Sequence, residues 1–190
     1  YGIVIFLTTN ADGFLPTILS RCVVLQLKPA TNEAVARYLV ETVQIPDYKA
    51  RLCAAFAQGN VGKAVRYASK ESFDEMRQHV SQLLKNISDM QESRIYETVG
   101  ELTAYKENIN DYLDLMLLWF RDVLIFKVTK DANSMVLREE LAGISGRAAR
   151  SSYEGLEEII VAIDRARTRL RANVSFELVM ELLLFTIKEN

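Results

Sequence analysis

Few residues of this chain could take part in chemistry, and the arginine at position 21 is the first candidate. It lies in the stretch FLPTILSRCVVL, between a proline-containing turn and an apolar run. A guanidinium carries a permanent positive charge and offers two parallel N–H donors to a phosphate or carboxylate. No nucleophile, general base or metal ligand accompanies Arg21 at a recognisable spacing. The charge that it would stabilise therefore need not be held by its own chain.

The segment GNVGKAV, residues 59–65, is a second candidate because it contains two glycines and a lysine. A phosphate-binding P-loop has four residues between its glycines and a Ser or Thr directly after the lysine. Here two residues separate Gly59 from Gly62, and Ala64 follows Lys63. The sequence instead predicts a helix that ends at Gly59 and a new helix that begins after it.

The remaining polar candidates are weaker. The single histidine, His79, and the two cysteines, Cys22 and Cys53, are too few and too far apart for a zinc site. We interpret both cysteines as reduced thiols and His79 as a solvated or half-buried helix residue. No metal site is predicted.

The run DRARTRLR is a candidate for contact with nucleic acid or with an acidic partner. Its arginines occupy alternate positions: Arg165, Arg167, Arg169 and Arg171. Arginines two residues apart spread around a helix and do not gather on one face. The whole chain has 23 basic and 25 acidic side chains and a net charge of −2, whereas nucleic-acid-binding domains are usually basic.

The elements that must position Arg21 change in kind along the chain. The opening run YGIVIFLTTN and the run CVVLQL, residues 22–27, are typical of buried parallel strands. A buried strand needs neighbours on both sides, so these two strands are expected to belong to a larger sheet in a longer protein. After Leu27 the pattern becomes helical, with three short helices followed by a longer helical region. A break is expected near Gly143 and Gly146.

Residues 3–29 resemble the end of the nucleotide-binding domain of AAA+ clamp-loader subunits. In that family a strand ends in a sensor-1 polar residue, and a Ser-Arg-Cys motif follows whose arginine acts in trans as an arginine finger. The resemblance makes Arg21, between Ser20 and Cys22, the candidate finger. It places three residues at the sensor-1 position: Thr8, Thr9 and Asn10.

The stretch AFAQGNVGKAVRYA resembles the sensor-2 helix of the lid in the same family, which makes Gly62 and Lys63 sensor-2-like residues. ATP-hydrolysing members carry an arginine where Gly62 stands, and a glycine cannot reach a γ-phosphate. This departure favours the branch of the family that neither binds nor hydrolyses ATP. The chain itself is then expected to bind no cofactor, and ATP and Mg²⁺ would be held by the neighbouring subunit.

The stretches LLWFRDVLIFK and RANVSFELVMELLLF resemble the helical collar of bacterial clamp loaders. The resemblance implies a mainly α-helical chain in three parts. Residues 1–28 would be the remnant of the nucleotide-binding domain with two strands, residues 29–70 a three-helix lid, and residues 71–190 a collar of five to six helices. One stripe of the last helix is expected to form the collar interface: Phe176, Val179, Leu183 and Leu184.

The resemblance implies a non-catalytic subunit of the bacterial DNA polymerase III clamp loader. It would supply Arg21 to a neighbouring ATPase subunit and hold the ring through its collar. The implied partners are the gamma/tau and delta subunits and, through the complex, the sliding clamp and primed DNA. Two alternatives stay open: a fragment of the ATP-hydrolysing gamma/tau subunit, and a stand-alone helical DNA-binding module. No apolar run reaches the about 20 residues that cross a bilayer, and a cytoplasmic location is expected.

Overall fold

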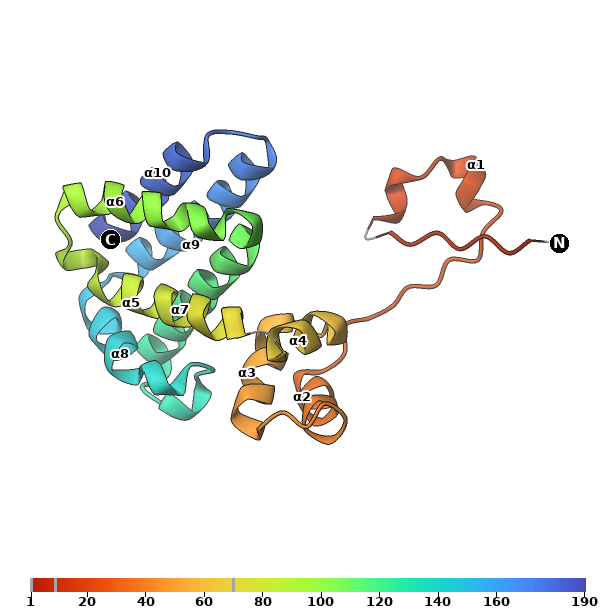
Figure 1. The fold of residues 1–190 in the computed structure, drawn as a ribbon, viewed down its shortest axis with the longest axis horizontal. Coiled ribbons are helices and arrows are strands. Elements are labelled where there is room, and N and C mark those ends of the chain that lie inside the picture. Colours follow the sequence, from red (N-terminus) through yellow and green to blue (C-terminus); the bar gives the residue numbers. More distant parts are fainter. Residues whose placement is uncertain (1, 9, 70) are drawn as a thin grey trace.

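The computed structural model describes residues 2–8, 10–69 and 71–190. These residues form ten α-helices and five short 3-10 helices, and among them there is no β-strand. The prediction of a mainly helical chain is therefore confirmed. Figure 1 shows an N-terminal segment that stands apart from the helices and is joined to them by an extended stretch.

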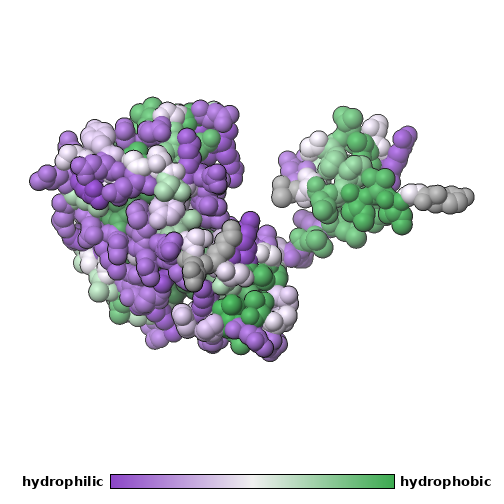
Figure 2. Space-filling model, viewed as in Figure 1, coloured by the Kyte–Doolittle hydropathy of each residue, from purple (hydrophilic) through white to green (hydrophobic). Residues whose placement is uncertain are grey.

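The two segments predicted to be strands are extended but unpaired within the described part of the chain. Between them lie the 3-10 turn η1 (Ala11–Gly13) and the single-turn helix α1 (Pro16–Leu19). An extended segment becomes a strand only when a neighbouring segment supplies backbone hydrogen-bond partners. The prediction of two strands is corrected accordingly, because the described residues offer no such neighbour. Ile3 is 93% exposed, and Leu7 and Leu27 are each 90% exposed, so this segment forms the largely apolar lobe of Figure 2.

Three short helices follow: α2 (Asn32–Glu41), α3 (Asp47–Ala57) and α4 (Val61–Ala68). The Thr31 hydroxyl caps α2, and the Asn60 side chain caps α4 by accepting from the N–H of Lys63 at 2.9 Å. The three helices pack through a shared set of buried side chains that includes Val35, Leu39, Cys53, Phe56 and Ala64.

Gly59 fixes the connection between α3 and α4. Its φ is +84°, in the left-handed region, and a Cβ at this position would lie 2.5 Å from the carbonyl oxygen of Ala30. The N–H of Ala30 donates to the Gly59 carbonyl at 3.1 Å. Glycine is thus required both for the turn and for the close approach of the chain entering α2.

Six further helices complete the chain: α5 (Glu71–Asn86), α6 (Glu92–Leu102), α7 (Ile109–Thr129), α8 (Leu141–Arg150), α9 (Tyr153–Arg171) and α10 (Phe176–Glu189). The 3-10 helices between them are η2 (Ile87–Asp89), η3 (Thr103–Asn108), η4 (Ala132–Ser134) and η5 (Arg138–Glu140). Helix α7 is apolar on most sides, as in Leu113, Trp119 and Phe120, and it packs against α5, α8 and α9. It is therefore the central helix of this region.

The expected break near Gly143 and Gly146 is wrong, because α8 runs unbroken through both residues. A Cβ on Gly143 would lie 2.8 Å from Cγ of Lys85. The glycine therefore lets the Lys85 stem, which comes from α5, lie directly against α8. Gly143 thus serves close helix packing, whereas a Cβ on Gly146 would meet no atom within 4 Å, and neither glycine ends the helix.

Two buried charges also hold this region together. The carboxylate of Asp122 on α7 accepts from the N–H groups of Val136 and Leu137 at 2.8 and 2.7 Å, and burial raises its pKa. The Arg147 guanidinium donates to the Ser88 hydroxyl and to the Ile187 carbonyl in the last turn of α10. Burial lowers the pKa of Arg147. These contacts anchor the 136–137 segment to α7 and the end of α10 to α8.

Candidate functional site

Arg21 lies directly after α1, where a short turn presents it to solvent. The helix begins at Pro16 and is capped at Ser20, whose hydroxyl donates to the carbonyl of Thr17 at 3.2 Å. The backbone N–H of Arg21 donates to the Ile18 carbonyl at 3.0 Å. The Arg21 side chain is exposed and forms no ion pair or side-chain hydrogen bond with any residue that the structure describes. The guanidinium is therefore available to an anion from outside this segment.

The sensor-1-like residues Thr8 and Asn10 are occupied in a local turn. The Thr8 hydroxyl donates to the Asn10 carbonyl at 2.8 Å and accepts from the Asn10 N–H at 3.0 Å. The Asn10 side chain accepts from the N–H of Asp12 at 3.0 Å and caps η1. Thr9 lies outside the described residues. The side chains of Thr8 and Asn10 thus form hydrogen bonds with the backbone between the two extended segments.

The two cysteines differ in exposure. Cys22, the last residue of the Ser-Arg-Cys motif, is an exposed free thiol, whereas Cys53 is buried in α3. Burial raises the pKa of Cys53 to about 11, so this thiol stays protonated at neutral pH. No cluster of His, Cys, Asp and Glu suited to a metal occurs within residues 2–8, 10–69 and 71–190.

Lys63, the sensor-2-like residue, is held inside the chain. Its ammonium lies 3.0 Å from a carboxylate oxygen of Asp114 and 3.6 Å from one of Asp111, both on α7. It also lies over the rings of Phe56 and Tyr67, 5.4 and 5.5 Å from their centroids. Two carboxylates and two aromatic faces therefore neutralise and fix this cation.

The carboxylates of Asp111 and Asp114 each accept a hydrogen bond from one further residue. Asp114 accepts from the guanidinium of Arg167 on α9 at 2.6 Å, and Tyr67 donates to Asp111 at 2.5 Å. Burial and the Asp111 carboxylate raise the pKa of Tyr67. We call this group the α4–α7–α9 network; its members are Lys63, Tyr67, Asp111, Asp114 and Arg167. It joins the short helices to the long ones.

One feature of the sequence indicates that α7 needs cationic partners. Asp111 and Asp114 are three residues apart, so they lie on the same face of α7. Two carboxylates on one face of an otherwise apolar helix require cationic partners. Gly62, by contrast, contacts none of these groups, and the nearest atom to a Cβ placed there is Oδ1 of Asn60, at 3.6 Å.

His79 is half-buried in α5, as the sequence indicated. Its Nδ1 lies 2.8 Å from the hydroxyl of Tyr112, and its ring lies 5.2 Å from that of Tyr105. Burial lowers the pKa of His79, and the nearby Glu101 carboxylate opposes that change. The side chain belongs to an aromatic cluster between α5, η3 and α7.

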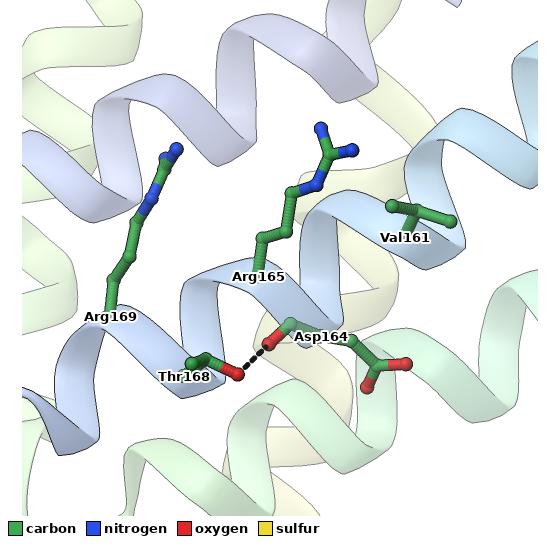
Figure 3. Close-up of a pocket in the computed structure, with 5 residues that line it drawn as sticks. All are labelled: Val161, Asp164, Arg165, Thr168 and Arg169. Carbon is green, nitrogen blue, oxygen red and sulfur yellow. Dashed lines mark hydrogen bonds between the residues drawn. The ribbon is translucent and has the colours of Figure 1, made fainter.

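The arginines of α9 divide between two faces. Arg167 points to α7 and binds Asp114, whereas Arg165 and Arg169 line a shallow groove of about 330 Å³ on the surface, together with Val161, Asp164 and Thr168. Figure 3 shows both surface guanidinium groups extending in the same direction. Arginines two apart therefore lie on different faces, as the sequence predicted, while Arg165 and Arg169, four apart, share one face.

No helix among the described residues is long and apolar enough to cross a membrane. Residues 71–189 match the family described as "DNA polymerase III, delta subunit, C terminal". This match covers more than half of the 190 residues. The chain belongs to this family.

A comparison with a curated relative agrees with membership of the polymerase III family. The chain is 26% identical over 188 residues to "DNA polymerase III subunit delta'" of Bacillus subtilis (strain 168). The alignment covers 97% of this chain and 56% of the relative, so the chain spans about half of that protein's length. No solved structure matches the chain. The resemblance to subunits of bacterial DNA polymerase III is thereby confirmed.

Within this polymerase III family region, the predicted collar interface needs a correction. The side chains of Phe176, Val179, Leu183 and Leu184 are all buried against other helices of the same chain. They form part of the chain's own core, so they cannot also face another subunit. The apolar residues that α10 does present to solvent are Leu178 and Leu182, which are 49% and 46% exposed.

Proposed function

We propose that this chain is the end of the nucleotide-binding domain, the lid and the collar of a delta-prime subunit of a bacterial DNA polymerase III clamp loader. The similarity to subunit delta' over 97% of the chain supports this assignment, as does membership of the polymerase III family. Residues 1–28 end the nucleotide-binding domain, residues 29–70 are the lid and residues 71–190 are the collar. The subunit is cytoplasmic and acts in DNA replication.

Arg21 acts as an arginine finger for the ATP of a neighbouring gamma/tau subunit. The observation that carries this proposal is the exposed guanidinium, which has no partner among the described residues and follows the single-turn helix α1. As the bond to the γ-phosphate breaks, negative charge on its oxygens needs neutralisation. A guanidinium supplied in trans contributes roughly 10³ to 10⁵ in rate in GTPases. Hydrolysis then depends on assembly of the ring.

The subunit itself does not hydrolyse ATP. Gly62 has no side chain to offer a phosphate, and Lys63 is engaged by Asp111 and Asp114. Both observations argue against the alternative of an ATP-hydrolysing gamma/tau fragment. ATP and Mg²⁺ are held by the neighbouring subunit. The partners of the chain are the gamma/tau and delta subunits, and the complex acts on the sliding clamp and primed DNA.

A stand-alone DNA-binding module is less well supported. Of the four arginines that favoured it, Arg167 is committed to Asp114 inside the chain. The net charge of −2 also argues against a surface that binds DNA by itself.

The test is Arg21→Ala in the full-length subunit, assembled with the other clamp-loader subunits. We expect the ATPase activity that DNA and clamp stimulate to fall at least about tenfold at the site that Arg21 completes. Arg21→Lys is expected to restore little, because an ammonium does not reproduce the two parallel donors.

The matched control is Arg37→Ala, which removes another exposed arginine, on α2. It is expected to leave the stimulated ATPase unchanged. If the Arg21→Ala complex assembles fully and hydrolyses ATP at the normal rate, Arg21 is not a finger.

A further inference from the structure

Helix α10 is apolar on two opposite sides. One stripe faces the core and includes Val179, Leu183 and Ile187. A second stripe, formed by Leu178, Leu182 and Phe185 at spacings of four and three residues, lies on the opposite side. Leu178 and Leu182 are about half exposed. An apolar helix stripe is normally buried against a neighbour, so the outer stripe of α10 lacks a cover in the isolated chain.

Helix α6 extends this apolar surface on one side. It packs against α10, and its Tyr96 is 54% exposed. The Tyr96 ring meets the ring of Phe185 edge-on, with the centroids 5.7 Å apart. Figure 2 shows apolar colour at the upper end of the helical body, where Figure 1 places α10.

Helix α9 also packs against α10 and contributes positive charge. It packs along α10 as the preceding antiparallel helix, and its Gly155 approaches Asn190 at the end of α10. Arg165 and Arg169 project from α9 to solvent (Figure 3). Neither forms an ion pair with a residue in the described part of the chain.

The acidic groups nearby do not neutralise these arginines. Asp164 lines the same groove but forms no ion pair with Arg165 or Arg169 among the described residues. On α10, Glu177 accepts from the Ser175 hydroxyl at 2.9 Å, at the start of the helix. An apolar stripe beside two uncompensated guanidinium groups is complementary to a helix that carries apolar and acidic side chains.

We propose that the outer surface of α9 and α10 is where the chain binds an amphipathic helix of another clamp-loader subunit. We call this surface the α9–α10 face; its residues are Arg165, Arg169, Leu178, Leu182, Phe185 and, from α6, Tyr96. The partner helix places apolar side chains on Leu178 and Leu182 and carboxylates opposite Arg165 and Arg169. Apolar residues at the centre and charges at the rim are the usual arrangement of a protein interface. This inference rests on the proposed function, because it takes the partner to be a clamp-loader subunit.

The test measures binding of the full-length subunit to the purified remaining clamp-loader subunits, without ATP. Arg165→Glu combined with Arg169→Glu is expected to weaken binding at least about tenfold, because it sets carboxylates against carboxylates. The loss is expected to shrink as salt is raised, because salt screens exposed charges. Leu178→Ala combined with Leu182→Ala removes apolar contact without adding charge, so it is expected to weaken binding to a similar degree at all salt concentrations.

Two controls keep the test specific. Arg37→Glu combined with Arg51→Glu makes the same change of charge on exposed residues of α2 and α3, and is expected to leave binding unchanged. Circular dichroism and thermal unfolding check that each variant is folded. The arginine variants alter only exposed side chains, so they decide the question if the leucine variants unfold.

Three results would overturn the proposal. Unchanged binding by both folded variants would show that the α9–α10 face is not used. A dimer of the full-length subunit that the leucine variants dissociate, with normal binding of the other subunits, would assign the face to a second copy. Salt-sensitive DNA binding that only the arginine variants lose would assign it to nucleic acid.

The outcome is separable from the test of Arg21. If the α9–α10 variants fail to assemble while the assembled Arg21→Ala complex keeps its ATPase, the face is correct and the finger is wrong. If the α9–α10 variants assemble normally and Arg21→Ala lowers ATPase, the reverse holds.

Discussion

The N-terminal segment, residues 2–28, and the helical region, residues 29–190, differ in how far their apolar side chains are buried. In the helical region these side chains form one continuous buried core that runs from Val35 to Ile187. In the N-terminal segment Ile3, Leu7 and Leu27 face solvent. The helical region has the contacts to stabilise itself, whereas the N-terminal segment carries apolar surface that only a further chain or further residues could cover.

The two regions also differ in whether a cationic side chain has partners within the chain. Arg21 has no partner among the described residues, whereas Lys63 has two carboxylates and two aromatic rings around it. The resemblance had placed both residues near a nucleotide. An arginine that acts on another subunit must remain unpaired until assembly, while a lysine that orients a lid is best fixed within its own chain. The difference supports a role in trans for Arg21 and a structural role for Lys63.

The largest expected effect is the difference in stability loss between two leucine-to-alanine substitutions, one in each region. Leu84→Ala removes a fully buried side chain of α5 and is expected to lower the free energy of unfolding by about 2–5 kcal/mol. Leu7→Ala in the same 190-residue chain is expected to change it by less than about 0.5 kcal/mol. Urea unfolding followed by circular dichroism measures both values.

The same pair of substitutions sharpens the comparison in the full-length subunit. If residues 2–28 complete the sheet of a nucleotide-binding domain there, Leu7→Ala becomes costly, about 2 kcal/mol or more. A cost of that size already in the 190-residue chain would contradict the contrast, because Leu7 would then have to be packed on the helices.

The sequence predicted the helices well and the rest less well, for physical reasons. The change to a helical pattern after Leu27 was predicted, and helices α2 to α10 follow it, because periodicity is a local property. The two strands were not found, since pairing depends on segments that these residues do not contain. The inner face of α10 was misassigned as an interface because both of its faces are apolar, and no local pattern distinguishes them. The two carboxylates on one face of α7 indicate a need for cations, but Lys63 lies 51 positions from Asp114, so the sequence does not identify it as the partner.

An intermediate effect is expected from Asp114→Ala, which breaks the α4–α7–α9 network. It leaves Lys63 and Arg167 partly buried without their shared carboxylate. We expect a loss of about 1–3 kcal/mol in the free energy of unfolding, since partly buried charges that lose a partner are destabilising. Asp164→Ala, an exposed acid on α9, is the matched control and is expected to change little.

A double-mutant cycle between Lys63 and Asp114 tests the same comparison directly. If the pair is structural, Lys63→Ala and Asp114→Ala together cost less than the sum of the single substitutions. The opposite result has two parts: the two substitutions have additive effects on stability, and Lys63→Ala lowers the ATPase of the assembled complex. That result would favour a nucleotide-binding role for Lys63.

The smallest expected effect is a pH dependence from His79. Burial lowers its pKa in the folded chain, so the unfolded chain binds a proton more readily. The contribution of neutral His79 is therefore complete above its unfolded pKa of about 6.5 and declines as the pH falls below that value. Carboxylates titrate over part of the same range, so the measurement must be a difference. His79→Gln lacks this proton uptake, and its free energy of unfolding is expected to fall less than that of the unaltered chain between pH 7 and pH 5.5. Parallel curves for the two proteins would show that the half-buried imidazole next to Tyr112 is protonated as easily in the folded chain as in the unfolded one.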